Sequence, residues 1–340
     1  MTAASMRAVA FSGVRNLELV RLPVPDPGHG QAVVRVAACG VCGSDLHLYE
    51  LDAMPAGSVM GHEFCGVVEA VGPGGGLEVG ERCVGWPLLA CRQCAACHAG
   101  LVDRCDSPRR TGIGGNPGAY AECVLIDTET ALRVPAAVDD ITAALTEPLS
   151  VGLHAVRRSR LRPGDSCVVV GAGCIGLMVV QCALLGGAVD VTVVEPAVQR
   201  GEAARRFGAT RVLASAAAAR DQGAGRPADV AFECAGAPGT LQLAADMVRR
   251  GGEVVGVGVS HEDSLRIPVW LTKELTLRMA SETHSAFPLA LRLLVDGRVR
   301  PASMVSRQAA LEELPALFAA ETDARREVKA VWVPGPASPG

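Results

Sequence analysis

The chain has 340 residues, which is enough for two domains with separate hydrophobic cores. Its formal net charge of −4 argues against nucleic acid or an anionic membrane as a partner. Residues 166–189 are uncharged and long enough to span a bilayer, but a β-branched run followed by glycines favours a strand, a turn and a helix. The first seven residues do not resemble a signal peptide. Thirteen cysteines therefore indicate metal-bound thiolates in the reducing cytoplasm.

Residues 7–38 alternate apolar and polar side chains in short runs separated by proline and glycine. This pattern predicts antiparallel strands joined by turns, and the β pattern continues over residues 66–85. The N-terminal part is therefore expected to be rich in β-structure.

The stretch that follows these first strands carries three kinds of side chain that zinc prefers. Cys42, His62 and Glu63 supply a thiolate, an imidazole and a carboxylate, and a fourth position would stay open, as in a catalytic zinc site. Ser44 is close enough in sequence to pass on a proton from the substrate oxygen, and Asp45 could hold the far nitrogen of His62. The alternative is a buried cysteine beside an unrelated His–Glu pair.

A cluster of cysteines comes next, with the spacing C-x2-C-x2-C-x7-C. It consists of Cys91, Cys94, Cys97 and Cys105. Four thiolates at this spacing can enclose one tetrahedral zinc, so the cluster predicts a structural zinc site in which His98 is surplus. The alternatives are four free thiols or an iron–sulfur cluster, although a ferredoxin-type run needs another final spacing and a following proline.

Glu147 directly precedes Pro148 at the start of a predicted helix. A carboxylate at this position is favoured by the helix dipole, which is a purely structural role. The functional alternative is a zinc ligand or a partner of the water bound there.

From residue 165 onward strands and helices alternate. A strand, the glycine sequence of residues 171–176 and a helix predict a dinucleotide-binding turn in a Rossmann domain, and the acidic Glu195 ends the next strand. Glu195 would bind the ribose hydroxyls and favour NAD, whereas Arg200 could turn toward a 2′-phosphate. Further strands are expected over 229–234, 253–258 and 275–279. The predicted cofactor contacts are Gly171, Gly173, Cys174, Ile175, Gly176, Glu195, Arg200, Cys234 and Gly256.

The last part of the chain is predicted to form an amphipathic helix over residues 286–296. The proline- and glycine-rich tail from residue 334 is expected to be disordered.

Taken as an ordered set, these motifs resemble the zinc-dependent medium-chain dehydrogenase/reductase family over nearly the whole chain. Glu147 and the residues after it are most similar to the sorbitol (polyol) dehydrogenase branch, with threonine and butanediol dehydrogenases as close neighbours. The resemblance implies an α/β protein with a GroES-like, β-rich catalytic domain at 1–152 and 286–340. Its structural zinc lobe would cover about 88–108, and a Rossmann NAD-binding domain would cover 153–285.

The same resemblance implies two zinc ions per subunit and a homodimer or homotetramer. The catalytic zinc would lie between the domains on Cys42, His62 and either Glu63 or Glu147, and Ser44 and His47 match the family's proton relay. Glu147 departs from the vertebrate-type alcohol dehydrogenases, which place a cysteine ligand there.

The expected reaction is hydride transfer between NAD and a polar secondary alcohol, such as a polyol, diol, amino alcohol or cyclitol. Only two tyrosines, three tryptophans and six phenylalanines are present, so an aromatic-walled pocket is hard to build. Tyr49 and Glu50 are candidates for the far side of the pocket. The alternatives are an NAD- and zinc-dependent elimination or epimerisation through a transient ketone, a general alcohol or threonine dehydrogenase, and a non-enzymatic binding role.

Overall fold

The computed structural model describes residues 4–215, 218, 227–258, 263–281, 283, 285–324 and 327–335. Most of the tail that we expected to be disordered lies outside these ranges. The chain forms two compact units. Unit 1 contains Met1–Glu147 and Phe287–Gly340, and unit 2 contains Pro148–Ala286.

Unit 1 is built on β-structure, as predicted. Strands β1 (Ser5–Gly13) and β2 (Asn16–Pro23) form an antiparallel hairpin. A larger sheet has the strand order β16-β17-β3-β4-β5-β9, with β8 also paired to β3. Its strands are β3 (Gln31–Gly40), β4 (Glu63–Val71), β5 (Arg82–Gly85), β8 (Cys123–Asp127), β9 (Ala131–Arg133), β16 (Val305–Ala309) and β17 (Lys329–Trp332).

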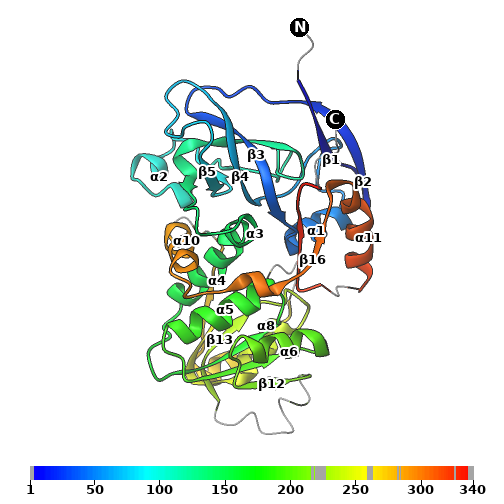
Figure 1. Ribbon diagram of the computed structural model, residues 1–340. Coiled ribbons are helices and arrows are strands. Elements are labelled where there is room, and N and C mark those ends of the chain that lie inside the picture. The colour runs from blue at the N-terminus through cyan, green and yellow to red at the C-terminus, as the bar shows by residue number, and fades with distance from the viewer. Residues whose placement is uncertain are drawn as a thin grey trace. The chain divides into compact units, whose positions relative to one another are not determined.

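Short helices accompany this sheet in unit 1 (Figure 1). They are α1 (Gly43–Glu50), α2 (Ala95–His98), α3 (Asp140–Ala144), α10 (Phe287–Val295) and α11 (Leu314–Ala324), while α4 (Thr146–Arg158) starts in unit 1. Helix α10 confirms the helix predicted over 286–296. Helices α1 and α11 pack together although they come from opposite ends of the chain. The core between them contains Tyr49, Tyr120 and Phe318.

The described part of unit 2 contains six strands in one parallel sheet, with the order β12-β11-β10-β13-β14-β15. They are β10 (Ser166–Val170), β11 (Asp190–Val194), β12 (Arg211–Leu213), β13 (Ala228–Glu233), β14 (Val248–Gly256) and β15 (Thr276–Met279). The described helices that follow α4 are α5 (Cys174–Leu185), α6 (Val198–Arg206), α8 (Thr240–Met247) and α9 (Ile267–Lys273). Strands covered on both faces become continuous apolar runs, which explains the valines of β10.

This doubly wound arrangement confirms the predicted Rossmann fold. Among the described residues, none of the helices is both long and apolar enough to cross a membrane.

Candidate functional site

The first group of candidate ligands lies in unit 1, where β3 gives way to α1 and where β4 begins. One ligand atom each from Cys42, His62 and Glu63 lies within 4.8 Å of the others. Cys42 is the N-cap of α1, and Glu63 is the first residue of β4. Gly61 turns the chain toward them with a φ of +93°, and a side chain there would collide with the ring of Tyr120. Three donor types that zinc prefers therefore converge at one point.

Asp45 holds this group from behind. Its Oδ1 lies 3.5 Å from Nδ1 of His62, as predicted, and its Oδ2 accepts a 3.2 Å hydrogen bond from the backbone N–H of Cys42. The hydroxyl of Tyr120 donates to the same Oδ2 at 2.5 Å. Because Nδ1 of His62 faces Asp45, Nε2 is the nitrogen available to a metal.

The electrostatics of these buried groups fit a cation. Burial lowers the pKa of His62, but the negative charges of Asp45 and Cys42 outweigh it and hold that pKa well above its usual value. Burial opposes ionisation of Asp45 as well, yet His62 and the hydrogen bond from Tyr120 bring its pKa below the ordinary value. Nδ1 of His62 and Oδ1 of Asp45 are buried without a hydrogen-bond partner. The negative charges of Asp45 and Cys42 therefore favour a positive charge at this place. A bound metal cation would supply it.

Ser44 and His47 lie three residues apart on α1 and therefore on the same side of the helix. The hydroxyl of Ser44 donates to Sγ of Cys42 at 3.2 Å. Tyr49, the candidate for the far side of the pocket, is buried in the core of unit 1. Its hydroxyl donates to the carbonyl of Arg15 at 2.6 Å, and its ring packs edge-on against Phe318.

Glu147 is not part of the three-residue group, although it is close enough to feel its charges. Burial raises the pKa of Glu147 to about 7; His62 and Lys329 oppose this rise, and Glu63 and Asp45 add to it. The geometry therefore brings Glu63 into the group and leaves Glu147 beside it.

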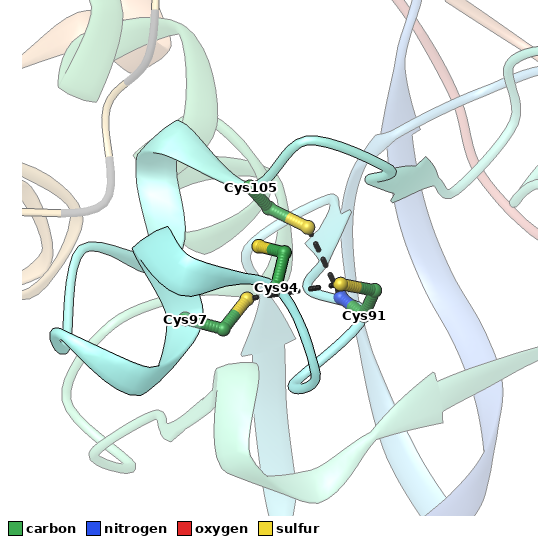
Figure 2. A group of neighbouring side chains, drawn as sticks. All are labelled: Cys91, Cys94, Cys97 and Cys105. Carbon is green, nitrogen blue, oxygen red and sulfur yellow. Dashed lines mark hydrogen bonds between the residues drawn. The ribbon is translucent and has the colours of Figure 1, made fainter.

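The four lobe cysteines come together, as Figure 2 shows. Their sulfur atoms lie within 4.8 Å of one another, and Sγ of Cys91 is 4.0 Å from Sγ of Cys97. A tetrahedral Zn–S₄ site with bonds of about 2.3 Å needs sulfur separations of about 3.8 Å.

The protonation behaviour of these thiols also fits a cation. Burial and the neighbouring thiols raise the pKa of Cys97 to about 12, while the backbone N–H of Cys91 lowers the pKa of Cys105. The four thiols therefore do not all ionise unless a positive charge lies among them. A bound metal would supply that charge.

In unit 2 the glycine turn joins β10 to α5. Gly171 has a φ of +94°, and a side chain at Gly176 would collide with the carbonyl of Gly171. Gly173 is the N-cap of α5 and has open space at its Cβ position. Cys174 and Ile175 form the first turn of α5, whose start has no side-chain cap. A helix start without a side-chain cap and with open space at Gly173 suits the pyrophosphate of a dinucleotide.

Glu195 lies directly beside this turn. Its Oε2 accepts a 2.8 Å hydrogen bond from the N–H of Ala172, and its Oε1 accepts one of 2.8 Å from Ala197. Arg200 follows in the first turn of α6. Cys234 directly follows β13, where its N–H donates to the carbonyl of Val170, and Gly256 ends β14. A side chain at Gly256 would meet Met279, so this glycine is packed on that side.

We call Cys42, His62 and Glu63 the metal group. Sequence reasoning missed two buried residues next to this group, Tyr120 and Lys329. Lys329, on β17, forms an ion pair with Glu63. Both are brought in from distant parts of the chain, so no local spacing could have shown them. The one available signal was the rarity of these residue types, since the whole sequence contains only two tyrosines and two lysines.

Comparison with known proteins adds independent findings. Residues 28–136 match the alcohol dehydrogenase GroES-like domain, and residues 174–296 match the zinc-binding dehydrogenase family. The chain is 32% identical to a sorbitol dehydrogenase of Bacillus subtilis over 91% of each protein. It is 31% identical to (R,R)-butanediol dehydrogenase of the same organism, over 91% of this chain and 94% of that protein.

Among solved structures, a protein of Sinorhizobium meliloti described as a zinc-binding dehydrogenase bound to NADP aligns with a TM-score of 0.88. The two sequences are 30% identical, and the alignment covers 97% of this chain and all of that one.

Proposed function

The chain belongs to the zinc-dependent medium-chain dehydrogenase/reductase family of alcohol and polyol dehydrogenases, and from this premise we propose that it oxidises a polar secondary alcohol with NAD. The observation that carries the proposal is the convergence of Cys42, His62 and Glu63 within 4.8 Å, with Ser44 hydrogen-bonded to the thiolate position. The reaction is a reversible hydride transfer that yields a ketone or an aldehyde.

In this proposal Cys42, His62 and Glu63 hold the catalytic zinc, and the four lobe cysteines hold a structural one. Bound zinc supplies a Lewis acid that polarises the oxygen of the substrate alcohol. Asp45 orients His62, and Tyr120 holds Asp45 in place. Glu147, whose pKa is raised to about 7, lies outside this three-residue ligand set, and we propose that it partners the water bound to the zinc.

Ser44 and His47 would carry the proton of the substrate hydroxyl. Ser44 lies next to a metal ligand, since its Oγ is 3.2 Å from Sγ of Cys42. His47 follows one turn later on α1 and is partly exposed, so it can pass the proton to solvent. This order of groups supports the proposed relay from Ser44 to His47.

The glycine turn of residues 171–176 would hold the pyrophosphate of NAD. Bound NAD supplies the nicotinamide ring that accepts the hydride. Glu195 supports NAD over NADP because its carboxylate, fixed beside the turn by Ala172 and Ala197, would repel a 2′-phosphate. Cys234 and Gly256, at the carboxyl ends of their strands, would border the same site.

The substrate would carry a hydroxyl or an amine next to the reacting carbon. Ser44, Glu63 and Glu147 make the surroundings of Cys42 and His62 polar. A vicinal hydroxyl or ammonium of the substrate can form a hydrogen bond there, whereas a plain alcohol has no second polar group to do so. The polyol and diol dehydrogenases among the relatives support this choice.

The test is a comparison of a vicinal diol, an amino alcohol and a simple alcohol of matched length at saturating NAD, followed by NADH absorbance. We expect the diol or the amino alcohol to have the higher kcat/KM. A simple alcohol with the highest kcat/KM would show that the polar-substrate proposal is wrong.

We also propose a homodimer or homotetramer. Ile267 and Leu271 of α9 and Leu277 and Met279 of β15 are exposed apolar residues, and β15 is the last strand in the order of the described sheet. Such an edge can pair with a second copy. Analytical ultracentrifugation of the protein with Leu277→Lys and Met279→Lys should show smaller species than the unchanged protein. A cytoplasmic location is supported by the thirteen cysteines, none of which forms a disulfide.

A further inference from the structure

Glu63 is held by a buried cation that the zinc-binding motif does not contain. Its Oε2 forms an ion pair with Nζ of Lys329, and both side chains are almost completely buried, with exposed fractions of 1% and 2%. The same Nζ donates a 2.8 Å hydrogen bond to the carbonyl of Val41, which directly precedes Cys42. The ammonium therefore lies between a predicted metal ligand and the backbone that leads to another.

The sheet of unit 1 explains why Lys329 reaches this place. Gly40 at the end of β3 pairs with Glu63 on one side and with Val331 of β17 on the other. Lys329 is two residues before Val331, so its side chain points to the same face as that of Glu63. A Cβ at Gly40 would overlap Oε2 of Glu63 and crowd Cε of Lys329. Because Gly40 has no side chain, the carboxylate of Glu63 and the ammonium of Lys329 have room to form their ion pair there.

The residue type is informative in this chain. Only two of its 32 basic residues are lysines, and both ammonium groups bond to backbone carbonyls. Lys273 donates to three carbonyls between residues 245 and 248. A compact ammonium fits such an enclosure, whereas a planar guanidinium does not.

The pair also affects the charge that a metal would meet. A carboxylate whose charge is partly offset by an ammonium attracts a dication less strongly, and the ammonium itself repels the dication. Breaking such a buried pair by removing one partner leaves an uncompensated charge, which a metal could then neutralise. Lys329 and a metal therefore compete for the charge of Glu63.

We propose that Lys329 is a positioning residue of the metal group: it holds Oε2 of Glu63 against β3, leaves one carboxylate oxygen for zinc, and lowers the affinity of the group for the metal. This inference rests on the proposed zinc site at Cys42, His62 and Glu63. It assigns to the last strand of the chain a direct influence on how firmly the catalytic metal is retained.

The test is a competition between the zinc-loaded protein and a chromogenic chelator, with zinc release followed at equilibrium. The Cys42→Ser protein is expected to hold only the lobe zinc. The zinc that it releases is therefore subtracted from the zinc released by each other variant. We expect Lys329→Met to retain the zinc of the group about tenfold more tightly than the unchanged protein. The matched control is Lys273→Met, the same change at the other lysine in unit 2, which should leave zinc retention unchanged. Equal or weaker retention by Lys329→Met would overturn the inference.

A second comparison avoids the unpaired carboxylate and thus any failure of Lys329→Met to fold. Glu63→Gln leaves the ammonium without its carboxylate and should weaken zinc retention. Adding Lys329→Met to Glu63→Gln removes the repulsion and should restore retention about tenfold relative to Glu63→Gln alone. No difference between these two variants would contradict the inference.

The same data separate this inference from the proposed function. If the unchanged protein holds no zinc that Cys42→Ser removes, the proposed catalytic site fails. If that zinc is present and the Lys329 variants retain it as the unchanged protein does, only the role of Lys329 fails.

Discussion

The hydroxyl of Tyr120 donates a 2.5 Å hydrogen bond to Oδ2 of Asp45, and both side chains are completely buried. Asp45 in turn faces His62, so the phenol acts on the candidate metal ligand through the carboxylate. We expect Tyr120→Phe to weaken zinc binding at the group by about 10–100-fold, because such supporting hydrogen bonds orient the ligand.

Chelator competition measures the effect of Tyr120→Phe. Tyr49→Phe is the matched control, because the only other tyrosine donates to the carbonyl of Arg15 instead. Equal zinc retention in the two variants would contradict the supporting role of Tyr120.

Cys105→Ser should remove one zinc per chain and lower the melting temperature. The four lobe thiols lie within 4.8 Å of one another, and a closed thiolate site contributes its binding energy to folding. Metal analysis and thermal unfolding check this, with His98→Ala as the control because His98 is an exposed neighbour in the same lobe. A Cys105→Ser protein with two zinc ions would rule out the structural site.

Glu195→Ala should weaken NAD binding by about tenfold or more and reduce the discrimination against NADP, because it removes a charged hydrogen-bond acceptor beside the turn. The change also removes the acceptor for Ala172 and Ala197. Glu195→Gln is therefore the companion variant, since it keeps one acceptor oxygen and loses the charge. Comparable kcat/KM with NAD and NADP in the unchanged enzyme would show that the NAD preference is wrong.

Glu147 should make stability depend on pH when the metal group is empty. Burial raises its pKa in the folded protein to about 7, above the ordinary value of 4.5. The folded state thus binds this proton more tightly than the unfolded state. Stability from this source is full below pH 4.5, declines as pH rises toward 7, and is lost above it, with a total of about 3 kcal/mol.

Cys42→Ser, which keeps the lobe zinc, is the background for this measurement. Adding Glu147→Gln to it should flatten the pH dependence of the unfolding free energy between pH 4.5 and 8. An unchanged slope would mean that another group is responsible.

The parts of the fold that depend on neighbouring residues in sequence were predictable. The valines of β10, the glycines of residues 171–176 and the spacing of the four lobe cysteines each act within one or two adjacent elements. The same holds for Asp45, which lies within one turn of Cys42.

Contacts set by sheet register were not predictable in this way. Lys329 contacts Glu63 because β17 pairs with β3 and β3 pairs with β4. Tyr120 reaches Asp45 because its ring packs directly against the backbone of Gly61. Tyr49 follows His47 closely, so it was expected near the substrate. Its ring instead fills the core against Phe318, a contact that depends on how α11 packs on α1.

The most direct test of the account measures zinc content and NADH formation from a vicinal diol in the unchanged protein and in Cys42→Ser. We predict two zinc ions per chain and NADH formation in the unchanged protein. Cys42→Ser should keep its fold and one zinc but lose NADH formation, because one of the three ligand positions is gone. NADH formation by Cys42→Ser at the rate of the unchanged protein would contradict the account.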